Sequence, residues 1–168
     1  MAIPVGAFFE QNRWANERLL AVCEGLSDEQ LDATGVGVYG SIREMLLHVL
    51  SSEQYYLERA AGVVPEERVT IDVWPGFEVL KRVAAATSSG LAEWAERLPA
   101  GAAVAGRASD GFTETLASVF FVQAFNHSTE HRTQILSVLT ALGAGPEGLD
   151  DEISGWAWGE ESGALKPR

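Results

Sequence analysis

The sequence predicts an all-α protein, a four-helix bundle with a short extra C-terminal helix. Four segments carry apolar residues at helical spacing, and glycines or prolines separate them at short or medium distances. Helices that each carry one apolar face bury these faces against one another, so four of them are expected to form a bundle. We expect one domain over residues 1–160 and a loose C-terminal tail over residues 161–168.

Loop and capping signals delimit the first two helices. The first is expected over Val5–Glu24, with an apolar stripe of Phe8, Ala15, Leu19 and Val22. A glycine-rich loop at Gly35–Gly40 follows, and the second helix then begins with Ser41 and Glu44 at the S-x-x-E spacing of a capping box. Gly62 ends this helix.

The second half of the chain contains the longest predicted helix. A third helix is expected to begin at Pro75 and to end before Pro99, and residues 101–111 have only weak strand character. The fourth helix is expected over Thr113–Leu142, and a short amphipathic piece over Leu149–Trp158 closes the fold. The stripe of the fourth helix consists of Leu116, Phe120, Ala124, His127, His131, Ile135, Val138 and Leu142.

All three histidines of the chain lie on or near apolar helix faces. His127 and His131 are four residues apart, which places both imidazoles on one face of the fourth helix. His48 lies near the apolar stripe of the second helix. Three buried imidazoles near one another are costly unless something shared satisfies them, so we favour one divalent metal ion over ordinary core histidines. Three ligands would leave a coordination position open, as in catalytic sites.

The histidine pattern allows more than one metal and more than one reaction. Imidazole ligands suit zinc, nickel, iron(II) or copper, so the ligand type does not identify the metal. Residues 127–131 also spell H-x-x-E-H, the inverted zinc-peptidase signature, in which Glu130 would be the general base. A peptidase would need an acidic third ligand further along the chain, and His48 would have no role. The peptidase is therefore the less favoured alternative.

Five further side chains are candidates for supporting the histidines: Gln123, Gln134, Glu130, Tyr55 and Asn12. On an ideal helix Gln134 and Gln123 point within about 20° and about 40° of His127, where an amide could hold a ring N–H. Tyr55 could line the mouth of the site. Asn12 lies on the stripe of the first helix, where it could brace a ligand but helix packing explains it better.

Composition argues against several classes of partner. The net charge is -12, with 12 Lys+Arg against 24 Asp+Glu, so we expect neither nucleic acid nor an anionic membrane surface as a partner. No apolar run is long enough to cross a bilayer, and the N-terminus does not have the pattern of a secretory signal. Cys23 is the only cysteine, so we expect no internal disulfide and a cytoplasmic location.

Three segments carry a resemblance to a known family. Asn12–Leu19, Gly40–Leu50 and Asn126–Ile135, the last containing the pattern H-x-x-x-H-R-x-Q, occur in order and at suitable separations. Together they resemble the DinB/YfiT-like family of small metal-binding helical bundles, over nearly the whole chain. The resemblance implies an up-down-down-up four-helix bundle, a homodimer, and a site of His48, His127 and His131 that holds zinc, nickel or iron.

The resemblance leaves the reaction open. Several members of the family are thiol-dependent transferases or isomerases that use mycothiol or bacillithiol, and others have no assigned reaction. Our leading hypothesis is a metal-dependent thiol S-transferase or hydrolase-type enzyme, with a low-molecular-weight thiol and a small electrophile as partners. The alternatives are a non-catalytic metal-binding or stress-response module and a plain interaction bundle with core histidines.

Overall fold

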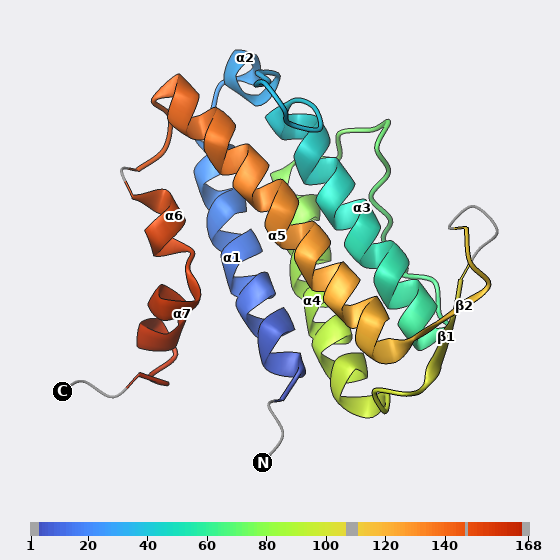
Figure 1. Ribbon diagram of the computed structural model, residues 1–168. Helices are drawn as coiled ribbons and strands as arrows, with labels where there is room; N and C mark the ends of the chain where they lie inside the picture. Colours follow the sequence, from blue (N-terminus) through green and yellow to red (C-terminus); the bar gives the residue numbers. More distant parts are fainter. Residues whose placement is uncertain (1–3, 107–110, 147, 166–168) are drawn as a thin grey trace.

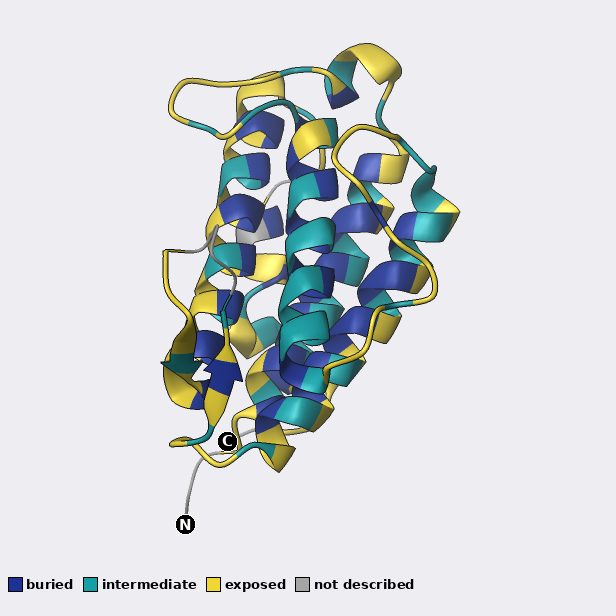
Figure 2. Ribbon diagram, turned by 90° about the vertical axis from the view of Figure 1, so that its right-hand side faces the viewer, coloured by how far each residue is buried: buried dark blue, intermediate teal, exposed yellow. Residues whose placement is uncertain are grey.

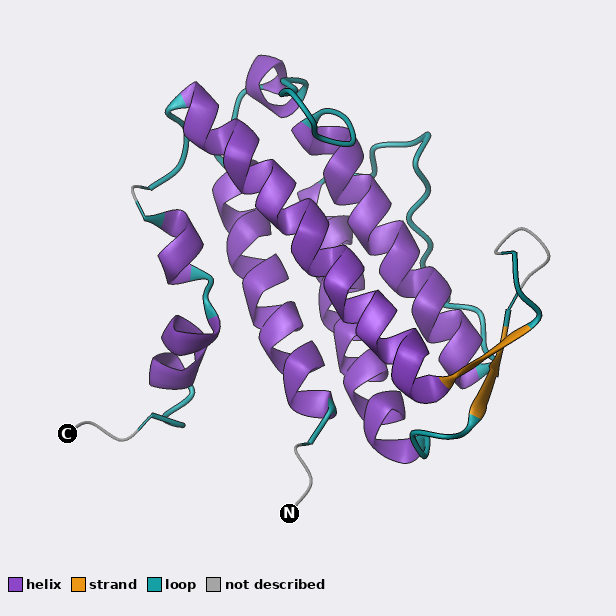
Figure 3. Cartoon of the chain, viewed as in Figure 1, coloured by secondary structure: helices purple, strands orange, loops and turns teal. Residues whose placement is uncertain are grey.

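The computed structural model describes residues 4–106, 111–146 and 148–165, and this part of the chain is mainly helical (Figure 3). Its helices are α1 Gly6–Glu24, α2 Asp28–Leu31, α3 Ile42–Ala61, α4 Phe77–Arg97, α5 Ala117–Leu142, α6 Leu149–Glu152 and α7 Gly155–Glu161. A two-stranded antiparallel sheet is formed by β1 Ala103–Ala105 and β2 Glu114–Leu116. The prediction of a helical protein is confirmed, with this small sheet as an addition.

The four long helices pack side by side along most of their lengths. Helix α1 contacts α4 and α5, and α3 contacts the same two helices. In Figure 1, α1 and α5 run in one direction, while α3 and α4 run in the other. The short helices α6 and α7 lie beside α1 and α5. Since α3 and α5 are neighbours, residues on their facing sides can form a common site.

The start of α3 follows the expected capping box. The Ser41 hydroxyl accepts a hydrogen bond from the Glu44 N–H (3.2 Å), and the Glu44 carboxylate accepts one from the Ser41 N–H (2.7 Å). Gly62 ends α3 with φ of 72°, a conformation that residues with a side chain rarely adopt. These two signals fix the helix that carries His48.

Three expected boundaries were wrong. Helix α4 begins at Phe77 instead of Pro75, because Gly76 has a non-helical φ of 87° and ψ of 158°. Helix α5 begins at Ala117 instead of Thr113, because residues 114–116 pair with β1 in the register Ala103 with Leu116. The short C-terminal helix is two helices, and the second starts where the Ser154 hydroxyl accepts a hydrogen bond from the Ala157 N–H.

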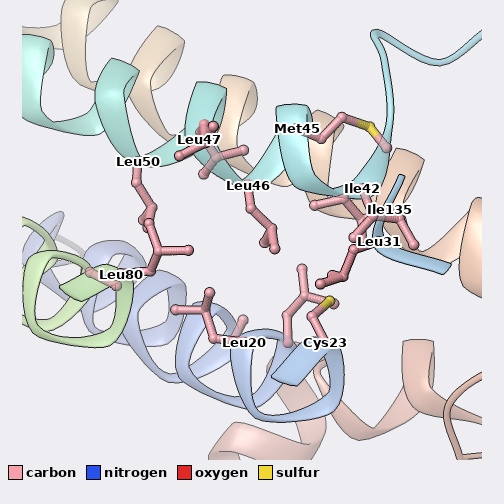
Figure 4. Packing of buried hydrophobic residues seen from close by; sticks show 14 of the residues in the cluster. Leu20, Cys23, Leu31, Ile42, Met45, Leu46, Leu47, Leu50, Leu80 and Ile135 are labelled. Atoms are coloured by element: carbon pink, nitrogen blue, oxygen red, sulfur yellow. The ribbon is translucent and has the colours of Figure 1, made fainter. Parts of the chain in front are cut away.

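The helix faces toward the interior are buried (Figure 2), and the apolar residues form two clusters. The larger cluster joins α1, α3, α4 and α5, and Figure 4 shows its packing, with residues such as Leu20, Leu50, Leu80 and Ile135 converging. The smaller cluster surrounds Phe9, Phe120 and Phe121.

Three stripe residues differ from the expectation: Phe8 is exposed whereas Phe9 is buried, Leu116 is 52% exposed on β2, and Leu142 at the end of α5 is 41% exposed. Within the described ranges, no helix is long and apolar enough to cross a bilayer. Of the expected tail, residues 166–168 lie outside the described residues, whereas Glu161 is the last residue of α7.

Candidate metal centre

The three histidines meet between α3 and α5. His48 comes from α3, and His127 and His131 come from successive turns of α5. The Nε2 atoms of His48 and His127 are 3.1 Å apart, and one ring nitrogen from each of the three lies within 4.8 Å of the others. The ring centroids are 4.6 to 4.9 Å apart. One ion could therefore be reached by all three side chains.

Gln134 orients His131. Its side-chain oxygen lies 3.0 Å from the His131 Nδ1 and also accepts a hydrogen bond from the Tyr39 N–H at 3.1 Å. An amide oxygen only accepts hydrogen bonds, so the His131 Nδ1 must carry the proton. The lone pair of His131 is then on Nε2, free to bind a metal, as is usual where the other ring nitrogen donates to a neighbour.

The environment favours the neutral form of His127 and His48. Burial, and then the neighbouring charges of His131 and His48, lower the pKa of His127 from 6.5 to about 4. Burial and the charge of His131 also lower the pKa of His48. Neutral imidazoles have the free lone pair that metal binding requires. The His127 Nδ1 is buried and has no hydrogen-bond partner among the described residues.

Tyr39 covers one side of the cluster, and the sequence analysis did not identify it. Its ring stacks on His48, with centroids 4.1 Å apart, and meets the edge of His131 at 5.4 Å. Although the side chain contacts both rings, the residue is 54% exposed, so it lies at the boundary between the site and solvent. The available signal was an aromatic residue inside the glycine-rich loop before α3.

A second polar group is buried among α1, α3 and α5, and the sequence analysis did not identify the glutamate at its centre. Glu53 is 0% exposed, and its Oε1 accepts hydrogen bonds from Asn12 (2.7 Å), Asn16 (3.0 Å) and Ser128 (2.7 Å). The Arg132 guanidinium donates to the side-chain oxygens of both asparagines. The signal in the sequence was a glutamate that continues the apolar stripe of α3.

The other proposed supporting residues do not contact the histidines through hydrogen bonds in the described ranges. Gln123 and Glu130 are exposed on α5. Asn12 belongs to the Glu53 group, and the Tyr55 ring meets the edge of Tyr56 at 5.6 Å. Gln134 contacts His131, not His127 as its direction around the helix suggested, because residues three apart are also neighbours along the axis.

The donor set fits a divalent transition metal. Metal–nitrogen bonds of 2.0 to 2.1 Å in a tetrahedral site place two ligand nitrogens about 3.3 Å apart. The 3.1 Å between the Nε2 atoms of His48 and His127 is close to this separation. The three ring nitrogens lie within 4.8 Å of one another, which allows a separation larger than 3.3 Å, so the His131 imidazole would move toward the other two when a metal binds.

Comparison with known proteins gives one finding about ancestry. The family model described as the DinB family matches residues 1–161. A search of curated proteins finds no match. The match includes all three histidines, the loop with Tyr39, and both short C-terminal helices.

Proposed function

Since the chain belongs to the DinB family, we propose that it is a metal-dependent enzyme of the thiol S-transferase or hydrolase type. His48, His127 and His131 would hold one divalent zinc, nickel or iron ion. The proposal includes an up-down-down-up four-helix bundle, a homodimer, a cytoplasmic location, and a low-molecular-weight thiol and a small electrophile as partners.

One observation carries the proposal: three imidazoles from two helices each bring a ring nitrogen within 4.8 Å of the others. Three protein ligands leave a position for a further ligand, which distinguishes catalytic sites from closed structural ones. When bound, the ion would lower the pKa of a thiol or water that joins it and so supply a nucleophile near neutral pH.

The protein residues would control charge and access. No carboxylate belongs to the cluster in the described part of the chain, so the ligands contribute no negative charge. A neutral set favours an anionic further ligand, such as a thiolate, more than a set with a carboxylate would. Tyr39 stacks on His48 at the solvent boundary and would shield one face of the site.

The geometry does not favour the peptidase alternative. Glu130 is exposed on α5 and, among the described residues, has no hydrogen bond or ion pair to a histidine. The third side chain at the site is His48, not a downstream acid. A general base must reach the proton that it removes, and Glu130 is oriented toward solvent.

Metal content tests the site. Untagged protein purified without chelator should contain about one equivalent of a transition metal by mass spectrometry, and His131→Ala should contain little. Gln123→Ala is the matched control, because it lies on the same helix at an exposed position and should keep the metal. Absence of metal in the parent after incubation with zinc, nickel and iron(II) would refute the site.

Turnover separates the enzyme from the non-catalytic module. We expect the metal-loaded protein to consume a thiol and an electrophile from a small panel, and His131→Ala to be inactive. A loaded protein that turns over neither the thiol panel nor hydrolysable esters, yet melts higher with metal than without, would support the metal-binding module instead.

A further inference from the structure

A large cavity lies along the face of α5 that points away from α3. Its volume is about 1140 Å³, and its walls come from α1, α5 and the C-terminal segment with α6 and α7. None of the three histidines lines it. Ligand cavities of proteins usually have volumes of about 300 to 1,000 Å³, so this one is large enough for a small molecule.

The cavity is elongated and mainly apolar. On α5 its lining extends from Phe125 to Thr140, which is about 22 Å along the helix axis. Phe8, Leu136, Ile153 and Trp158 supply apolar wall from the three sides. The C-terminal wall is fastened to α1, because the Gln11 side chain donates to the Ile153 carbonyl (3.1 Å) and Arg18 pairs with Glu161. A long apolar molecule fits such a space.

One buried cation contributes to the lining. Arg132 is 4% exposed, and in the described residues its guanidinium makes three hydrogen bonds, to Asn12, Asn16 and the Thr129 hydroxyl. A guanidinium has five N–H donors, so two are left. The bond to Thr129 involves Nη2 and is only partly buried, which places that edge of the guanidinium on the cavity side.

Arg132 has no carboxylate in direct contact among the residues described. The Asn12 amide lies between it and Glu53, because this amide donates to Glu53 and accepts from Arg132. Burial leaves the charged guanidinium poorly solvated. The hydroxyls of Thr129 and Thr133 donate to main-chain carbonyls of α5, so their protons are not available to a ligand that binds at Arg132.

We propose that this cavity binds a fatty acid, with its carboxylate at Arg132 and its chain along the apolar wall between α1, α5 and α7. The carboxylate would supply the direct ion pair that the guanidinium otherwise does not have, and the two planar groups match in geometry. The acyl chain would remove the apolar lining from water. This site is independent of the proposed metal function.

Calorimetry with three ligands of equal chain length tests the proposal. Decanoate, decanol and decylamine are titrated into native protein that has been treated with chelator, so that a carboxylate cannot bind to a metal. We expect one decanoate per chain, with decanol at least about tenfold weaker, because hydrogen bonds to a charged group contribute about 1.5 to 3 kcal/mol. Decylamine should not bind. Equal affinity for all three, or no saturable decanoate binding, would overturn the proposal.

A matched pair of variants locates the ligand. Ser137 lines the cavity at an exposed position of α5, so Ser137→Phe should fill part of the space and weaken decanoate binding at least about tenfold. Ser118 is an exposed serine near the start of the same helix and does not line the cavity, so Ser118→Phe should bind decanoate like the parent. Unchanged binding by a folded Ser137→Phe protein would overturn the location.

A measurement on the parent protein covers the case in which Ser137→Phe does not fold. Decanoate labelled with ¹³C at the carboxyl carbon should titrate at a lower pH when bound than when free, because the guanidinium favours the carboxylate. A bound carboxyl that titrates like the free acid would contradict contact with Arg132.

Discussion

The buried carboxylate of Glu53 leads to the most quantitative prediction. In Glu53→Gln the side-chain shape is nearly unchanged, but the negative charge is lost. Three hydrogen bonds at Oε1, from Asn12, Asn16 and Ser128, change from charge-assisted to neutral bonds. Each is weakened by about 1 kcal/mol, and the Arg132 charge loses its compensating partner, so we expect destabilisation of about 3 to 5 kcal/mol.

Urea unfolding monitored by far-UV circular dichroism measures this change. With an m-value of about 2 kcal/mol/M, the midpoint should fall by about 1.5 to 2.5 M. Glu130→Gln makes the same chemical change at an exposed position of α5, and its stability should stay within about 0.5 kcal/mol of the parent.

A double variant tests the coupling to Arg132. If Glu53 compensates the guanidinium, Glu53→Gln combined with Arg132→Met should be less destabilised than the sum of the single variants. Equal midpoints for Glu53→Gln and Glu130→Gln would refute the reasoning, because they would mean that no carboxylate charge is needed at position 53.

Three further predictions concern acid stability, thiol reactivity and helix capping. The unfolded state takes up a proton at His127 below pH 6.5, whereas the folded state does so only near pH 4. The free energy of unfolding of the metal-free protein should therefore fall by about 2 kcal/mol from pH 6.5 to pH 4, after allowance for solvent screening. In urea unfolding at the same pH values, His127→Ala should lose less. Burial raises the pKa of Cys23 from 9.0 to about 12, so a disulfide reagent at pH 8 should modify the native protein at least about a hundredfold more slowly than the urea-unfolded chain; equal rates would contradict the burial. Ser41→Ala removes the cap of α3 and should lower the melting temperature by about 2 to 4 °C in calorimetry, whereas Ser118→Ala should leave it unchanged.

Local signals predicted much of the helix content. The capping box at Ser41 and the glycine at position 62 specify the ends of α3 through interactions within a few residues, so they could be recognised without a tertiary structure. The start of α5 could not be recognised in this way. Its first expected residues pair with Ala103–Ala105 instead, and strand pairing depends on residues that are distant in the sequence.

The sequence by itself determined which residues could form the candidate site. The spacing of His127 and His131 places them one helical turn apart, whatever surrounds the helix. Only the tertiary structure decided what meets them: His48 at 3.1 Å from His127, the Tyr39 ring, and the Gln134 oxygen that selects the tautomer of His131. These contacts depend on how α3 and the preceding loop pack against α5, and helix periodicity contains no information about the neighbouring helix. For the same reason, the charge of Glu53 and the donors of Arg132 could be interpreted only once their buried partners were known.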